Sequence, residues 1–278
     1  MSVDVGQSTP DTFAGYPASQ VKACCAAAYQ HDAVALILGD SYHPGGPALT
    51  RRLADALRLR AGERVLDVAA GTGGTALLLA GQFGVSVDGV DLGKNQVDSA
   101  TRVAAETGLA DRVAFRVGDA ERLPYPDGCF DAVVCECAFC TFPDKPTAAA
   151  ELARVLKSGG RVGLTDVTIP PGTLTADLAG LAGWVACLAD ARPTDQYAAI
   201  LAATGLRVTA IENHDGALAR MVAQIDARLR AYRMLRLPAL TGVDIDRALT
   251  LTAQGAHAVT TGAAGYTLLI AEKPPRTR

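Results

Sequence analysis

The residues best suited to chemistry lie in the run Arg64–Thr75, which reads RVLDVAAGTGGT. An apolar strand leads into a turn of small residues that opens a helix, the unit that binds nucleotide-like cofactors at a helix N-terminus. Gly71 and Gly73 carry no side chain, so a ligand can approach the backbone closely there. The run therefore predicts a cofactor site around which the rest of the chain is arranged.

Two acidic residues follow the next two predicted strands. Asp91 ends the second strand, where a carboxylate can accept both hydroxyls of a ribose. Asp119 follows the third strand, where it can accept from an adenine amino group. The turn reads AAGTGG rather than the GxGxxG of dinucleotide enzymes, and a lone glycine-rich turn is weak evidence. These residues favour an adenosine-containing cofactor without distinguishing a nicotinamide from another adenosyl group.

Cysteines offer a second kind of chemistry. Several crowd into residues 135–140, at the predicted C-terminal end of the fourth strand. Ligands of open α/β sheets bind outside that edge, so Cys137 is expected close to the reacting group of the cofactor. Cys187 lies further on, and Cys24 and Cys25 are neighbours on a predicted helix. Adjacent helical residues diverge by about 100°, so one of that pair should face a given site. Thiolates that converge from distant segments can hold a soft ion.

Simpler interpretations apply to several of these residues. Free cysteine often behaves as a small buried hydrophobe, which is favoured for Cys129 and Cys140 and left open for Cys135. A zinc site is disfavoured because no second CxxC pair or paired histidines lie nearby. Tyr42 and His43 lie in a Gly/Pro-rich loop that could close over a site, although a histidine in a surface loop is the simpler interpretation.

Composition bounds the class of protein. The 278 residues have a formal net charge of -3, which argues against nucleic acid or an anionic membrane as a partner. Hydrophobic residues make up 49% of the chain, enough for a substantial core. No basic segment precedes an apolar stretch at the N-terminus, and no run approaches the length of a membrane helix. We therefore expect a cytoplasmic protein whose seven cysteines are reduced.

The elements that must position these residues alternate from Arg64 onward. Short apolar strands separated by helices predict a parallel sheet covered on both faces. We expect strands over Val65–Val68, Ser86–Asp91, Val113–Val117, Phe130–Glu136, Arg161–Val167, Leu206–Asn213 and Tyr266–Glu272. We expect helices over Pro17–Leu38, Leu49–Leu57, Thr75–Phe83, Lys94–Thr107, Thr147–Leu156, Asp177–Leu188, Asp195–Thr204 and Ala217–Leu235.

Three regions follow from this pattern. Residues 1–60 are expected to form a tail, mobile to about residue 15, and a helical cap with a loop at 39–47. Residues 61–170 are expected to form the cofactor-binding core. Residues 171–278 are expected to supply helices on the substrate side and the final strands of the sheet.

Four motifs, in order over about residues 60–170, resemble class I S-adenosylmethionine-dependent methyltransferases: VLDVAAGTGGT, VDGVDL, GDAERLPYPDGCFDAVV and ELARVLKSGGRVGLTDV. The resemblance implies an α/β fold with a Rossmann-like seven-stranded sheet, an N-terminal helical cap and helical C-terminal insertions. It implies S-adenosyl-L-methionine rather than a nicotinamide as cofactor. The cofactor-binding residues that it implies are Asp67, Ala69, Gly71, Thr72, Gly73, Asp91, Leu92, Gln96, Asp119, Ala120 and Glu136.

A narrower resemblance involves the cysteines. The turn TFPDK after Cys137 and the segment WVACLADARPTDQY around Cys187 are similar to arsenite methyltransferases. The resemblance implies arsenic(III) as the methyl acceptor, with Cys137, Cys187 and Cys24 or Cys25 as its catalytic ligands and a thiol reductant as a further partner. Three thiolates leave the arsenic lone pair free to attack a sulfonium methyl in line, so the main task of the protein is positioning.

Other functions stay open. Methyl transfer to a small organic acceptor such as a quinone, phenol or amine calls for a general base, for which Glu136, His43 and Tyr42 are candidates. A non-catalytic metalloid-binding or sensing protein would keep the fold and the thiols. A nicotinamide oxidoreductase is the least favoured class.

Overall fold

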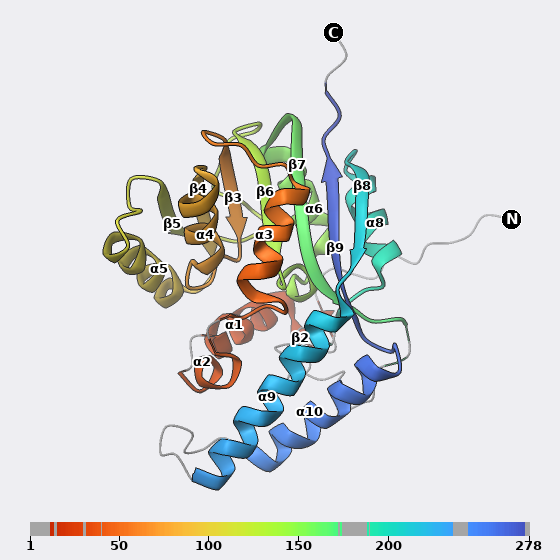
Figure 1. Cartoon of the computed structure of the whole chain (residues 1–278). Coiled ribbons are helices and arrows are strands. Elements are labelled where there is room, and N and C mark those ends of the chain that lie inside the picture. Colours follow the sequence, from red (N-terminus) through yellow and green to blue (C-terminus); the bar gives the residue numbers. More distant parts are fainter. Residues whose placement is uncertain are drawn as a thin grey trace, which may run out of the picture.

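A seven-stranded sheet forms the centre of the computed structural model, with its strands in the order β5-β4-β3-β6-β7-β9-β8 (Figure 1). The predicted Rossmann-like α/β fold is confirmed. The structure describes residues 12–13, 16–29, 32–39, 41–171, 173, 188, 190–235 and 244–275. The strands of the sheet are β3 Arg64–Val68, β4 Ser86–Asp91, β5 Val113–Val117, β6 Phe130–Glu136, β7 Leu156–Thr168, β8 Arg207–Asn213 and β9 Gly265–Glu272.

One strand departs from the expected parallel arrangement. Strands β5, β4, β3, β6 and β7 pair in parallel, but β9 pairs antiparallel with both β7 and β8. Two long helices, α9 Asp215–Leu235 and α10 Ile245–Thr260, lie between β8 and β9 in the chain and pack on each other. This pair returns the chain to the end at which β8 finished, and the next strand must therefore run in the opposite direction.

The helices are α1 Ala18–Tyr29, α2 Asp32–Leu38, α3 Gly46–Ala56, α4 Gly74–Phe83, α5 Lys94–Glu106, α6 Lys145–Val155 and α8 Thr194–Ala203, besides α9 and α10. A short 3-10 turn, η1 Phe139–Thr141, follows β6. The expected helix Pro17–Leu38 is wrong as a single element, because α1 and α2 are separate helices in the described residues. The expected helix Asp177–Leu188 lies outside the described residues except for Leu188.

Local chemistry accounts for the shifted boundaries. Helix α3 begins at Gly46, inside the expected loop, because Pro47 suits the first turn of a helix. Helix α10 was not predicted; none of its residues is buried, and it packs on α9 rather than on the sheet. Thr12–Phe13 (β1) pairs with Tyr16–Pro17 (β2), within and beside the segment expected to be a mobile tail. The division into three regions stays a prediction.

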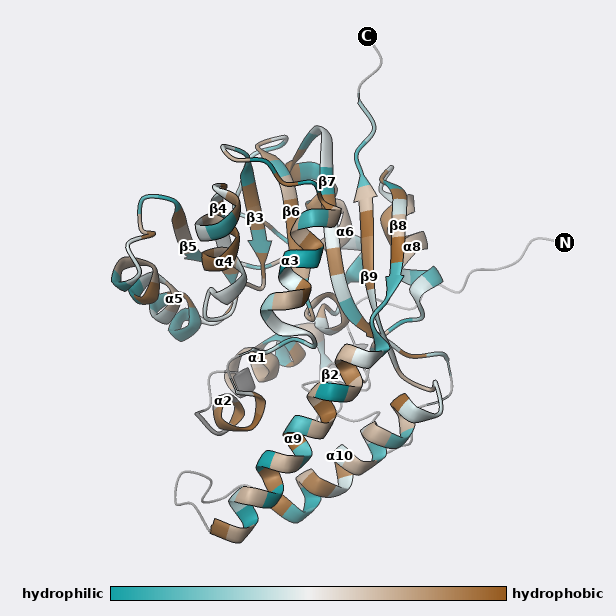
Figure 2. Ribbon diagram, in the orientation of Figure 1, coloured by the Kyte–Doolittle hydropathy of each residue, from teal (hydrophilic) through white to brown (hydrophobic). Residues whose placement is uncertain are grey.

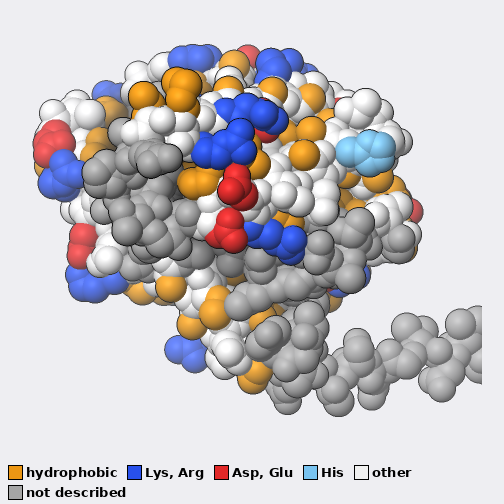
Figure 3. Space-filling model, turned by 90° about the horizontal axis from the view of Figure 1, so that it is seen from below, with side chains coloured by type: hydrophobic (Ala, Val, Ile, Leu, Met, Phe, Trp, Pro, Cys, Tyr) orange, Lys and Arg blue, Asp and Glu red, His pale blue; other side chains and the backbone are white. Residues whose placement is uncertain are grey.

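The core follows the middle of the sheet. Five of the seven residues of β6 are buried, which fits a strand covered on both faces. Figure 2 shows the central strands of the sheet as largely hydrophobic. Helices α9 and α10 contain both hydrophobic and hydrophilic residues and extend away from the sheet. On the face seen in Figure 3, Lys and Arg side chains lie beside Asp and Glu rather than in a patch of one sign. None of the helices described has the length and apolar character to cross a membrane.

Candidate active site

The order of the strands creates a crevice between β3 and β6. From β3 the chain moves outward through β4 and β5, then returns to β6 on the other side of β3. Open α/β sheets bind ligands at this switch point, outside the carboxyl ends of the strands. A cavity of about 230 Å³ lies there, lined by the ends of β3, β4 and β6, by α1, and by the loop before α3.

The glycine-rich turn after β3 forms one wall of this cavity. Asp91, at the end of β4, accepts a hydrogen bond from the backbone N–H of Gly71 at 2.9 Å and from that of Gly93 at 2.7 Å. Gly71 has φ of 53°, and a Cβ there would meet no protein atom within 4 Å. The turn is thus held in a conformation that leaves its backbone open to a ligand.

Gly73 has a different role. A Cβ at Gly73 would lie 2.6 Å from Cζ of Phe115 and 3.0 Å from the Cβ of Ala100, and its φ is 85°. Gly73 is not among the residues that line the cavity. Close packing of the turn against β5 and α5 therefore requires this glycine.

Three carboxylates give the cavity a negative potential. Asp67 is 2% exposed, and burial raises its pKa well above the usual value, with the charges of Glu136 and Asp91 raising it further. Burial also raises the pKa of Asp91. Asp67 Oδ2 and Glu136 Oε1 are buried without a hydrogen-bond partner. Buried acceptors are normally paired, so this cavity suits a cationic ligand that donates hydrogen bonds.

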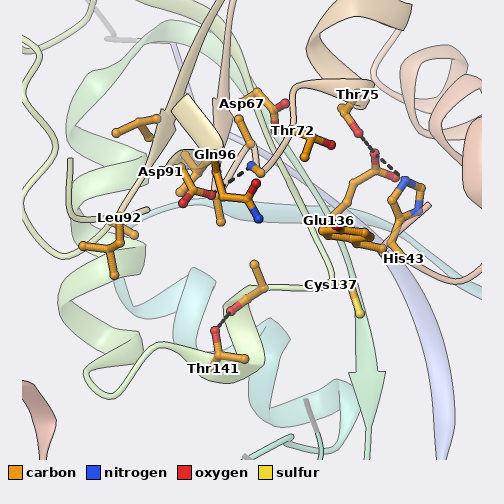
Figure 4. Close-up of a pocket in the computed structure, with 18 of the residues that line it drawn as sticks. His43, Asp67, Thr72, Thr75, Asp91, Leu92, Gln96, Glu136, Cys137 and Thr141 are labelled. Carbon is orange, nitrogen blue, oxygen red and sulfur yellow. Dashed lines mark hydrogen bonds and ion pairs between the residues drawn. The ribbon is translucent and has the colours of Figure 1, made fainter. Parts of the chain in front are cut away.

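Glu136 joins the cap to the sheet. Its Oε2 accepts from the hydroxyl of Thr50 at 2.9 Å and from that of Thr75 at 2.6 Å, and lies 3.6 Å from Nε2 of His43 (Figure 4). His43 belongs to the loop before α3 and is only 13% exposed, so it is not the surface histidine that the sequence favoured. Sequence patterns gave no signal for Thr50, whereas Thr75 could have been suspected from its place directly after the glycine turn.

Cys137 projects at the end of β6. The strand ends at Glu136, and Cys137 has φ of 54°, with its N–H donating to the carbonyl oxygen of Thr165 at 2.7 Å. Strand alternation therefore does not extend to Cys137, which lines the cavity, while Cys135 is fully buried. Burial raises the pKa of the Cys135 thiol well above its usual value, so it is not poised to ionise.

The other cysteines differ in whether they reach the cavity. Cys25 of α1 lines the cavity and Cys24 does not. Cys140 is buried, and Cys187 lies outside the described residues. Within the described part of the chain, no group of three His, Cys, Asp or Glu side chains is arranged to hold a metal ion.

The other residues expected at the cofactor also lie around this cavity. Figure 4 shows Asp91, Leu92 and Gln96 on one side of it and Glu136 with His43 on the other. Asp119 lines it too, and its Oδ2 accepts from Nζ of Lys22 at 2.7 Å, a partner that the sequence did not suggest. The cofactor residues of the sequence analysis that line this cavity are Asp67, Ala69, Gly71, Thr72, Asp91, Leu92, Gln96, Asp119, Ala120 and Glu136.

Comparison with known proteins points to one broad class. Residues 66–164 match a family described as a methyltransferase domain. The chain is 34% identical over 170 residues to methyltransferase GfsG of Streptomyces halstedii, an alignment that covers 60% of this chain and 61% of that protein. The chain therefore spans less than two thirds of that relative.

Solved structures share the fold over most of the chain. The [4+2]-cyclase SpnF, 26% identical, has a TM-score of 0.72 and is matched over 93% of this chain and 97% of its own. Phosphoethanolamine N-methyltransferase 2 of Haemonchus contortus, in complex with S-adenosyl-L-methionine, is 22% identical with a TM-score of 0.73, over 94% of this chain and 58% of its own.

Proposed function

We propose that this chain is an S-adenosylmethionine-dependent methyltransferase for a small-molecule acceptor, and that the acceptor is arsenic(III) bound by thiolates. One observation carries the proposal: the turn held by Asp91 lines the same cavity as the thiols of Cys25 and Cys137. The matched methyltransferase domain, residues 66–164, includes both the turn and Cys137. Methyltransferase GfsG and the Haemonchus contortus enzyme are not named for arsenic, so the proposed acceptor rests on the thiols.

The cavity fits the cofactor in charge and in shape. Asp67 Oδ2 and Glu136 Oε1 lack a donor, which the ammonium group of a methionine moiety would supply. Gly71 and Gly74 leave open space where any side chain would intrude. Asp91 would hold the ribose hydroxyls and Asp119 the adenine. When bound, this cofactor supplies an electrophilic sulfonium methyl group.

Two thiols from distant segments support the acceptor. Cys25 comes from the cap helix α1 and Cys137 from the end of β6, and soft thiolates favour soft ions. Cys137 is held at positive φ, and non-glycine residues in such strained conformations cluster at functional sites. A three-thiolate site would also need Cys187. Because arsenic(III) needs no proton removed, the residues of the chain would position it and exclude water.

The test is turnover of the full chain with arsenite, S-adenosylmethionine and glutathione, with methylated arsenic separated by chromatography. We expect Cys137→Ser to lower the rate by about 100-fold or more, because loss of a residue that only supports a metal ligand already costs about 10–100-fold. Cys129→Ser is the matched control, because Cys129 does not line the cavity. Absence of methylated arsenic with the wild-type chain, or full activity of Cys137→Ser, would overturn the arsenic assignment.

A second candidate is a small organic acceptor with an acidic hydroxyl. The supporting observation is the contact between His43 and Glu136, since a histidine beside a carboxylate can take up a proton. With phenols or hydroxyquinones as acceptors, His43→Asn should then slow turnover by about 100-fold or more. Cys137→Ser should leave that reaction nearly unchanged. The two variants thus have opposite effects under the two hypotheses.

Binding must be measured apart from transfer. A neighbour of this fold is named as a cyclase, and fold alone does not determine chemistry. Arsenite that changes Trp184 fluorescence without any methylated product would favour a metalloid-binding or sensing role. Binding of NAD in place of S-adenosylmethionine would favour an oxidoreductase.

A further inference from the structure

Lys22 fixes helix α1 to the loop that follows β5. Its Nζ donates to Asp119 Oδ2 at 2.7 Å and forms a second ion pair with Glu121. Glu121 Oε1 also accepts from the backbone N–H of Asp144 at 2.8 Å, at the start of α6. Lys22 therefore joins the cap helix to the loop after β5, and Glu121 links that loop in turn to the start of α6.

These contacts are shielded from solvent. The side chains of Lys22, Asp119 and Glu121 are 19%, 34% and 14% exposed, less than in an ordinary surface ion pair. Burial lowers the pKa of Lys22, but hydrogen bonds to Asp119 and Glu121 raise it by more, so the ammonium group stays charged. Both carboxylates balance the charge of this partly buried ammonium group. Helix α1 therefore has one preferred position on the sheet.

The position of Lys22 on α1 determines which of the two neighbouring thiols faces the cavity. Residues three apart lie on the same face of a helix, so Cys25 follows Lys22 on one stripe of α1. Cys24, two residues from Lys22, points about 200° away at 100° per residue. Lys22, Cys25 and Ala26 line the cavity, as that stripe requires.

We propose that Lys22 is a positioning residue, which holds α1 so that Cys25 rather than Cys24 faces the acceptor. Lys22 acts through the helix and not by touching the reacting atoms. The use of Cys25 as an acceptor ligand rests on the proposed function, whereas the orientation of α1 does not.

Alkylation of the two neighbouring thiols tests the orientation without an activity assay. Cys24→Ser and Cys25→Ser chains each leave one of the pair, and iodoacetamide labelling is followed by peptide mass spectrometry. S-adenosylhomocysteine should slow the labelling of Cys25 and leave that of Cys24 unchanged. Adding Lys22→Met should abolish the protection of Cys25, whereas Lys22→Arg should retain it.

A matched control keeps the comparison specific. Lys94→Met removes an exposed ion pair with Asp98 on α5, and because neither residue lines the cavity it should leave the labelling pattern unchanged. Glu121→Gln removes the charge of one of the two partners of Lys22 and should reduce the protection of Cys25 part of the way. This second variant decides the question even where Lys22→Met fails to fold.

Kinetics supply an independent readout. Lys22→Met should raise KM for arsenite about tenfold with a smaller change in kcat, the lower range for loss of an outer-shell partner. Equal protection of Cys24 and Cys25 by S-adenosylhomocysteine in the wild type would overturn the positioning role. Full protection of Cys25 in Lys22→Met, or in Glu121→Gln where Lys22→Met does not fold, would also overturn it. A wild-type chain with the expected labelling but no methylation of arsenite would overturn the proposed acceptor alone.

Discussion

At the scale of single residues, the buried carboxylates of Asp67 and Glu136 create a local conflict. Each has an oxygen without a partner, and each lies in the negative field of the other. Desolvating such groups costs free energy in the folded chain, and a cationic ligand would recover it. The two buried carboxylates therefore lower the stability of the ligand-free protein and raise its affinity for a positively charged ligand.

The free energy of unfolding of Asp67→Asn should depend on pH differently from that of the wild type. The folded pKa of Asp67 is raised, so its stabilising protonated form is fully present below the unfolded pKa of 3.8 and is lost as pH rises through the folded value. The free energy of unfolding of the wild type should therefore fall relative to that of Asp67→Asn as the pH rises from about 4 toward the raised folded pKa.

Urea unfolding of both proteins across that pH range measures the difference directly. Calorimetry should show weaker binding of S-adenosylmethionine by Asp67→Asn at neutral pH. A stability difference that stays constant with pH would contradict the raised pKa of Asp67.

Gly73 and Gly74 are neighbours with separable roles. Gly73→Ala would force a methyl group against Phe115 in a left-handed conformation, so it should lower the free energy of unfolding by about 1–3 kcal/mol. Gly74→Ala meets no protein atom within 4 Å and sits at the first position of α4, so it should leave stability intact. Its methyl group would enter the cavity and should weaken cofactor binding.

Urea unfolding and calorimetry with S-adenosylmethionine separate these two effects. Each glycine variant serves as the control for the other. If Gly74→Ala lowered the free energy of unfolding as much as Gly73→Ala, the contact with Phe115 would not explain the requirement for glycine at position 73.

At the scale of elements, Lys145 secures the turn after β6. It is 3% exposed, donates to the carbonyl oxygens of Cys140 at 2.7 Å and Phe142 at 3.1 Å, and forms an ion pair with buried Asp190. Helix α6, the wall of the cavity and the start of the segment before α8 are joined at this point. Burial raises the pKa of Asp190 by more than Lys145 and Arg192 lower it, so the pair is costly to bury.

Lys145→Met should lower the free energy of unfolding by up to about 3–5 kcal/mol, because the buried carboxylate of Asp190 then keeps only the more exposed Arg192 as a charged partner. Lys145→Met combined with Asp190→Leu removes both charges and should recover most of that loss. Urea unfolding measures both proteins, with Lys157→Met, which breaks a more exposed pair with Asp131, as the control. A double variant no more stable than the single one would contradict this account.

Element prediction from sequence succeeded where one segment carries its own signal. Strand β4 is found over Ser86–Asp91, as its apolar run between two turn segments predicts. Helix α10 was missed because none of its residues is buried, and the antiparallel direction of β9 depends on how α9 and α10 return the chain. The direction of β9 has no local sequence signature, whereas α10 begins after the N-cap residue Asp244, a local signal that the sequence contains.

At the scale of the whole molecule, the cavity joins parts of the chain that fold from distant segments. The cap contributes Lys22, Cys25 and His43, and the sheet contributes Asp91 and Glu136. A ligand bound there should therefore stabilise the cap and the sheet together, since a ligand that binds only the folded state shifts the unfolding equilibrium.

S-adenosylmethionine at about 100 times its Kd should add about 2.7 kcal/mol to the free energy of unfolding. For a chain of this size Tm should rise by roughly 5 °C or more. Asp91→Ala should abolish the shift, because Asp91 holds the N–H groups of Gly71 and Gly93. Differential scanning calorimetry makes the measurement with NAD as the control ligand, and an equal shift with NAD would contradict the assigned cofactor.

Sequence patterns are sufficient to predict the strands of the sheet, the glycine-rich turn and the acids that follow the strands. These features depend on the hydrophobic period and on residues close together in the chain, so a linear pattern records them. Three features become visible only in the folded chain. Gly73 is required for close packing against Phe115, Cys25 rather than Cys24 lines the cavity, and His43 lies 3.6 Å from Glu136. Each of these depends on how a helix or loop is seated against a strand far away in sequence, and contacts such as the ion pairs of Lys22 set that seating.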